Sequence, residues 1–136
     1  MTNNELSLSY ISKATKRLKI LTVLKDESAF SDVVREAQEI VELVQKAILR
    51  KIGIDPPKWH DVGEIIKANF ESIPKEYHNR ILDLIPNAKW LRGERELSFY
   101  GDIDFIPTEE YTINDAEIAI QSANDWVTIG TILCKD

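Results

Sequence analysis

The chain has 136 residues, which suits one domain, and its 43% hydrophobic and 29% charged residues are typical of a folded globular protein rather than a disordered one. The formal net charge of −6 excludes a surface that attracts nucleic acid as a whole, so any phosphate site must be a local basic patch. The single cysteine, Cys134, excludes an internal disulfide and a cysteine-based metal cluster. We therefore predict one domain over residues 1–136.

The N-terminus carries no signal for secretion. Residues 1–4 (MTNN) lack the charged and then apolar pattern of a signal peptide, and no long uncharged apolar run follows anywhere in the chain. These features predict a soluble, cytoplasmic protein that does not enter a membrane.

Two long helical patterns come first. In residues 7–24, apolar residues recur three and four positions apart, and residues 26–28 supply a turn and a helix cap. Residues 30–52 show a wide apolar stripe with charged residues opposite, and Gly53 with Pro56 and Pro57 ends that helix. This order predicts a long antiparallel helical hairpin. The stripe is broader than one hairpin partner needs, which favours a homodimer.

Two shorter helices are expected next. One begins near Asp61, where Glu64 follows at capping-box spacing, and another begins near Pro74, a good first-turn residue. Pro86 should break or kink the latter, because proline removes a helical hydrogen bond and clashes with the preceding turn. Residues 87–92 are then expected to form one further turn.

A long connection precedes the last helix. Residues 93–111 contain Gly101 and Pro107, and so long a loop in a compact domain is usually functional or mobile. The final helix begins at Thr112 with Asp115 at its third position. No segment of useful length has the period of a strand. The chain is therefore expected to be all-α, an up-and-down bundle of about five helices.

The segment 90–102 (WLRGERELSFYGD) holds the main candidate residues. Arg92 and Arg95 have planar guanidinium groups that suit a phosphodiester or a nucleotide, with Tyr100 close behind. The alternative is that both arginines pair with neighbouring carboxylates on the surface, where such pairs contribute little stability.

The two histidines carry weaker signals. Histidine side chains in general titrate near neutral pH, so His60 is a candidate general base, or it helps to organise the entry to the third helix. His78 lies among polar residues on a helix face, where we expect it to be solvated. The tryptophans Trp59, Trp90 and Trp126 adjoin apolar positions and are expected in the core. The sequence has no metal-ligand spacing and no glycine-rich phosphate loop, so we predict neither a metal nor a cofactor.

Several short motifs, in order, resemble the HEPN family (higher eukaryotes and prokaryotes nucleotide-binding). After the hairpin come residues 52–63 (IGIDPPKWHDVG) and 95–102 (RELSFYGD). Next come Ile106-Pro107 and Tyr111-Thr112, and the last helix then opens with Asp115-Ala116. The resemblance covers roughly residues 5 to 134 and is to the small stand-alone archaeal and bacterial members.

The resemblance implies a helical bundle that forms a symmetric dimer. In active members an arginine, followed after four to six residues by a histidine, cuts RNA without metal. The arginine stabilises charge on phosphorus and the histidine moves a proton. Such members often act as toxins beside a minimal nucleotidyltransferase, which in some systems modifies a tyrosine near the motif. Here Arg95 matches the arginine of the motif. Four residues then intervene, and the next position, where the histidine is expected, holds Tyr100.

The missing histidine shapes the functional hypotheses. A tyrosine hydroxyl ordinarily keeps its proton up to about pH 10, so it is a poor base at neutral pH. The leading hypothesis is a dimer that binds a nucleotide or RNA phosphate through Arg92 and Arg95, with Tyr100 beside them, and works with a nucleotidyltransferase partner. One alternative is a metal-independent ribonuclease that uses Arg95 with Tyr100 or His60. Another is a protein-interaction module without a ligand.

Overall fold

The computed structural model describes residues 3–58 and 61–135. This part of the chain is all-α, as predicted, and contains seven α-helices and two short 3-10 helices but no named strand. The elements are α1 (Asn3–Asp26), α2 (Phe30–Lys51), α3 (Val62–Ala68), η1 (Phe70–Ser72), η2 (Lys75–Tyr77), α4 (His78–Gly93), α5 (Arg95–Phe99), α6 (Pro107–Glu110) and α7 (Ile113–Leu133).

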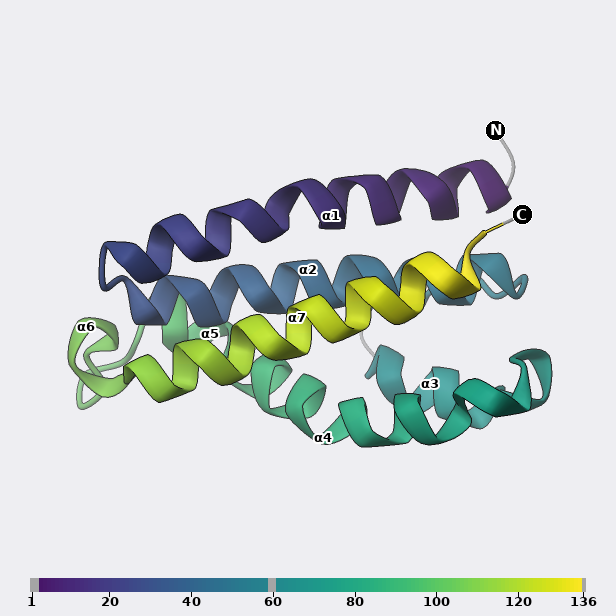
Figure 1. The fold of residues 1–136 in the computed structure, drawn as a ribbon. Helices are drawn as coiled ribbons and strands as arrows, with labels where there is room; N and C mark the ends of the chain where they lie inside the picture. The colour runs from purple at the N-terminus through teal and green to yellow at the C-terminus, as the bar shows by residue number, and fades with distance from the viewer. Residues whose placement is uncertain (1–2, 59–60, 136) are drawn as a thin grey trace.

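The predicted helical hairpin is confirmed. Figure 1 shows α1 and α2 running antiparallel, with α7 lying along both and α4 crossing below. The buried hydroxyl of Ser7 on α1 donates a hydrogen bond of 2.9 Å to the carbonyl of Ala47 on α2, which fixes the register of the pair. Trp126 of α7 is fully buried and is the largest side chain of the core.

The wide apolar stripe of α2 is used within the chain. Twelve residues of α2 are buried, and the helix packs against α1, α7, α5, α3, α4 and α6. Contrary to the expectation from the sequence, the breadth of the stripe does not indicate a homodimer, because six helices of the same chain cover it. A dimer therefore needs a different surface.

The last helix begins as predicted. The Thr112 hydroxyl accepts the Asp115 backbone N–H, and the Asp115 carboxylate accepts the Thr112 N–H, so two backbone donors at the helix start are satisfied. Near the other end, Gly130 lies where α7 meets α1 and α2. A Cβ added to Gly130 would collide with the Val44 side chain and lie 3.0 Å from Cδ1 of Ile11.

Two expectations for the middle of the chain were wrong in part. Of the predicted break or kink at Pro86, the break does not occur, since α4 continues through Pro86 to Gly93. Pro86 lies on the exposed side of α4, where water can satisfy the carbonyl that loses its helical partner. His78 is not simply solvated. Its Nε2 donates to the Ile73 carbonyl at 2.8 Å, and its ring stacks on Phe70 at 4.3 Å.

The cap of α3 differs in part from the expected capping box. The Asp61 carboxylate accepts the Gly63 N–H at 3.0 Å, as a cap should. The Glu64 carboxylate instead pairs with Lys89 at 2.8 Å, which lowers the pKa of Glu64 and ties α3 to α4.

The connection before α7 is more ordered than expected. It contains α5 and α6, joined by a tight turn in which Asp102 and Phe105 exchange two backbone hydrogen bonds of 3.0 Å. Gly101 has φ +68°, and a Cβ there would meet the Phe105 carbonyl and the Pro107 ring. The turn therefore requires glycine at this position.

Two general features follow from the described residues. None of their helices combines the length and apolar character needed to cross a bilayer. They also contain no group of three or more His, Cys, Asp or Glu side chains placed to share a metal ion.

The close packing at Gly130 generates a stability prediction. We expect Gly130→Ala to lower the free energy of unfolding by about 1–3 kcal/mol, because the added methyl overpacks a fully buried contact with Val44. Gly93→Ala is the matched control, since a Cβ at Gly93, at the end of α4, meets nothing within 4 Å. Urea denaturation measures both variants, and equal stability of the two would contradict this packing.

Candidate functional site

Arg92 and Arg95 lie together at one shallow depression. It has a volume of about 230 Å³ and lies between α2, the end of α4, the start of α5 and the segment that follows α2. Three of its lining side chains are cations and two are carboxylates. The lining residues are Gln38, Glu42, Lys58, Arg92, Arg95 and Glu96. The structure thus brings the two predicted arginines together and adds Lys58, which the sequence did not single out.

The short helix α5 is held in place by polar side chains of α2. The Arg35 guanidinium donates from Nη1 to the Arg95 carbonyl at 2.9 Å, and its Nε lies 3.2 Å from Oε1 of Glu39. The same guanidinium lies 4.9 Å from the centre of the Phe99 ring. Arg35 therefore joins both ends of α5 to α2.

Glu39 positions the arginine of the motif. The Nε–H of Arg95 donates to Oε1 of Glu39 at 3.1 Å, and the Arg35 Nε lies 3.2 Å from the same oxygen, so this carboxylate pairs with both arginines. The hydrogen bond with Glu39 raises the pKa of Arg95, which keeps its guanidinium charged. The Arg95 side chain is still 43% exposed, so an incoming anion can reach it.

The carboxylates at the depression are partly neutralised. Glu42 lies 3.3 Å from the ammonium of Lys46, one turn along α2. Of the two carboxylates that line the depression, Glu42 has Lys46 as a cationic partner, and Glu96 is the second negative charge beside Lys58, Arg92 and Arg95. An anion with more than one negative oxygen is the ligand that such a set of donors suits.

Tyr100 does not line this depression. It follows the last residue of α5 and is 70% exposed, with its ring edge-on to Phe99 at 4.9 Å. Tyr100 lies five positions after Arg95, and at 3.6 residues per helical turn this spacing directs the two side chains about 140° apart. The structure therefore separates two of the predicted site residues, and the expectation that Tyr100 lies beside the arginines is not met by the lining of the depression.

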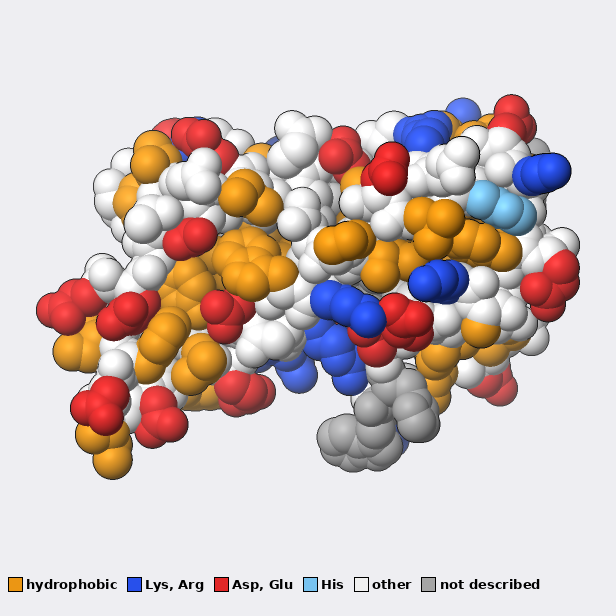
Figure 2. All heavy atoms as spheres, turned by 90° about the horizontal axis from the view of Figure 1, so that it is seen from below, with side chains coloured by type: hydrophobic (Ala, Val, Ile, Leu, Met, Phe, Trp, Pro, Cys, Tyr) orange, Lys and Arg blue, Asp and Glu red, His pale blue; other side chains and the backbone are white. Residues whose placement is uncertain are grey.

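The surface around Tyr100 is apolar and acidic. The segment 96–110 around it contains five carboxylates and no Lys, Arg or His. Phe99, Ile103 and Ile106 are 53%, 92% and 49% exposed in the same segment. Figure 2 shows hydrophobic and acidic side chains intermingled at the end of the molecule that carries α5 and α6, with Lys and Arg gathered nearer the middle. This surface repels phosphate, so stacking of an RNA base on Tyr100 is disfavoured.

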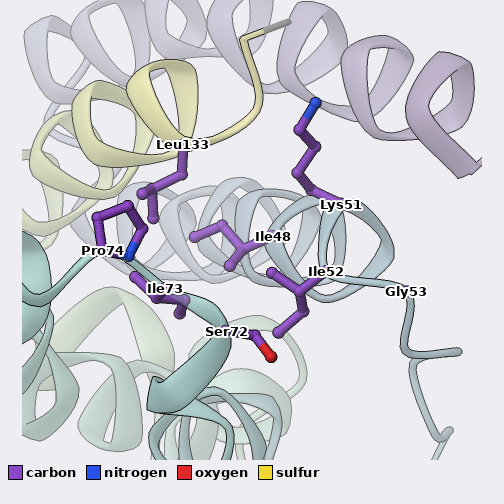
Figure 3. A pocket seen from close by; sticks show the side chains of 8 residues that line it. All are labelled: Ile48, Lys51, Ile52, Gly53, Ser72, Ile73, Pro74 and Leu133. Atoms are coloured by element: carbon purple, nitrogen blue, oxygen red, sulfur yellow. The ribbon is translucent and has the colours of Figure 1, made fainter.

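The largest cavity is a different one. It has a volume of about 460 Å³ at the opposite end of the bundle and is lined mainly by aliphatic side chains of α2, α7 and the segment between η1 and η2. Figure 3 shows the Lys51 side chain pointing away from it toward α1, where its ammonium lies 2.7 Å from the side chain of Asn4. This cavity therefore offers no cation to a phosphate.

His60, the other candidate base, lies outside the described residues, as does Trp59. Of the remaining tryptophans, Trp126 is fully buried and Trp90 is half-buried, as expected of core residues. Sequence reasoning missed Arg35, Gln38 and Glu39. It placed Arg35 and Glu39 on the outer face of the second helix, and only their contacts with α5 reveal their role.

Comparison with known proteins identifies relatives. A family model described as HEPN domain matches residues 8–130. A protein of Methanocaldococcus jannaschii named "Putative toxin MJ1304" is 27% identical over 126 residues, which cover 88% of this chain and 82% of that protein. No solved structure matches the chain.

The attachment of α5 generates a prediction. We expect Arg35→Ala to speed hydrogen exchange at the α5 amides of Ser98 and Tyr100 by tenfold or more, and to lower stability by about 1–2 kcal/mol, because α5 loses a charged hydrogen bond to its backbone. Arg17→Ala removes a pair with Glu36 between α1 and α2 and is the control. Equal exchange at α5 in the two variants would show that Arg35 does not hold it.

Proposed function

The chain belongs to the HEPN domain family, and from this membership and the site geometry we propose that it binds the phosphate of a nucleotide or RNA without cleaving it. The observation that carries the proposal is the convergence of Lys58, Arg92 and Arg95 on one depression of an otherwise acidic protein. Arginine donates two parallel hydrogen bonds to phosphate oxygens, and these charge-assisted bonds are among the stronger ones in proteins.

The absence of the motif histidine argues against RNA cleavage. Metal-free cleavage needs a group that accepts and returns a proton near neutral pH. Tyr100 occupies the histidine's place in the motif, is 70% exposed and does not line the depression. Within the described residues, His78 at the start of α4 bonds to the Ile73 carbonyl and stacks on Phe70, and it does not line the depression.

The biological setting that we infer is toxin–antitoxin-like. The Methanocaldococcus relative carries the name of a toxin, and the family resemblance implies a minimal nucleotidyltransferase partner. The hydroxyl of Tyr100, on an exposed and largely apolar surface, is a group that such a partner could reach and modify.

Ligand binding is the first test. We expect uridine 3′-monophosphate and a short single-stranded RNA to bind at low salt. Arg95→Ala and Arg92→Ala should each weaken binding by roughly 10- to 100-fold through loss of a charged hydrogen bond. Arg80→Ala, an exposed arginine near the start of α4, is the control and should bind as the parent does. Calorimetry or fluorescence anisotropy measures the affinities.

The same preparations distinguish the alternative functions. Incubated with RNA and a chelator, parent and Arg95→Ala should both leave the RNA intact. Cleavage by the parent that Arg95→Ala abolishes would establish a metal-independent ribonuclease instead. Failure of every probe to bind at low salt would leave a protein-interaction module as the function.

We also expect the chain to form a homodimer through the exposed apolar side chains of Ile103 and Ile106, with the Tyr100 hydroxyl outside the contact. Contiguous exposed apolar side chains mark contact surfaces, and the stripe of α2 is already covered. Light scattering at micromolar concentration should give twice the mass of one chain. Ile103→Asp should reduce it to the monomer, whereas Val23→Asp, an exposed apolar position on α1, should not. A monomeric parent would contradict this assembly.

A further inference from the structure

Gln38 is a buried polar residue at the wall of the cationic depression. It lies in the middle of α2, is 4% exposed, and lines the same depression as Arg92 and Arg95. Its side-chain oxygen Oε1 has almost no accessible surface and no hydrogen-bond partner within the described part of the chain, so a ligand reaches it through a rotation of the Gln38 amide. Native proteins pair nearly all such groups, so an unpaired acceptor beside a binding depression needs an explanation.

The neighbours of Gln38 in the depression do not provide that explanation. Lys58, Arg92 and Arg95 carry donors that suit an anion, and Arg95 is already turned toward Glu39. A phosphate group that enters brings only acceptor oxygens at neutral pH, so it satisfies the arginines and leaves the Gln38 oxygen unpaired. A ligand that carries a hydrogen-bond donor next to its phosphate would satisfy this oxygen as well.

A ribonucleotide has that arrangement. The 2′-hydroxyl is attached to the ribose carbon adjacent to the one that carries the 3′-phosphate, and it both donates and accepts hydrogen bonds. The depression of about 230 Å³ is smaller than the roughly 300–1,000 Å³ of sites that enclose a whole small molecule. It thus suits a sugar–phosphate unit whose base remains outside.

We propose that Gln38 makes this site selective for ribose over deoxyribose, by accepting a hydrogen bond from the 2′-hydroxyl of a nucleotide whose 3′-phosphate is held by Arg92 and Arg95. This inference rests on the phosphate-binding function proposed above. It adds recognition of the 2′-hydroxyl, which the cationic side chains do not distinguish. Phosphate contacts alone position a nucleic acid, and the 2′-hydroxyl lets a protein distinguish RNA from DNA.

The test compares two probes that differ by one hydroxyl, uridine 3′-monophosphate and 2′-deoxyuridine 3′-monophosphate. The parent should bind the ribose form roughly 3- to 10-fold more tightly, as one net hydrogen bond predicts. In Gln38→Leu this ratio should fall to about one, through loss of affinity for the ribose probe alone. The melting temperature of Gln38→Leu should equal or exceed that of the parent, because an unpaired buried polar group is removed.

Gln45→Leu is the matched control. Gln45 lies two turns further along α2, is 6% exposed, and also has a buried side-chain atom without a partner, Nε2, but it does not line the depression. Its leucine variant should keep the parent's preference for ribose. If Gln38→Leu does not fold, Gln38→Met, which keeps an unbranched side chain, replaces it.

The outcomes distinguish failure of the role of Gln38 from failure of the phosphate site. Equal affinity of the parent for both probes, with dependence on Arg95, would overturn the role of Gln38 and leave the phosphate site intact. A ribose preference that persists in Gln38→Leu, or that Gln45→Leu also loses, would overturn it as well. Failure of both probes to bind the parent would contradict the phosphate site and the role of Gln38 together.

Discussion

The burial of α2 is the constraint on which the rest of this structure depends. The helix contacts each of the other six α-helices of the described chain, and its apolar stripe supplies much of the core. Apolar burial is the dominant favourable term in folding, so α1, α4 and α7 are placed by what they cover on α2. The close approach of α7 at Gly130 follows from the same packing, since a larger residue there would meet the Val44 side chain.

The polar edge of the same helix builds the candidate site. Arg35 and Glu39 attach α5, and thereby fix the backbone and side chain of Arg95. Gln38 and Glu42, on adjoining positions, line the depression that these arginines share. A rigid core helix therefore presents the site, and the precision that phosphate recognition needs comes from side chains on a regular element rather than from a loop.

The charge distribution divides the protein into two functional surfaces. All but one of the lysines and arginines precede residue 96, and the acidic segment 96–134 carries Tyr100 and the most exposed isoleucine, Ile103. The proposed phosphate ligand suits the depression with its three cations and not the acidic surface around Tyr100. Arg95 and Tyr100 are close in sequence, yet we propose different partners for them. Arg95 binds a nucleotide, and Tyr100 meets a partner protein.

The sequence predicted the helical elements well, because periodicity and capping are local. The hairpin, the Thr112 cap and the all-α class were confirmed. The continuation of α4 through Pro86 was missed, since water satisfies a carbonyl on an exposed helix face, and α5 and α6 were missed because they are too short to show a period. Arg92 and Arg95 were predicted as site residues from residue type, and Arg95 also from the family motif. The structure adds that the two share one depression. The contributions of Gln38 and Lys58 depend on contacts between distant segments, which no local pattern records.

The most direct test of the account is a nuclear magnetic resonance titration with uridine 3′-monophosphate that follows the arginine Nε–H signals and the backbone amides. The account predicts that the Arg92 and Arg95 side-chain signals and the Gln38 side-chain amide shift together, at one affinity, while the amides of residues 99–106 stay in place. Shifts confined to residues 99–106, or no shift at Arg92 and Arg95 with saturating ligand, would contradict it.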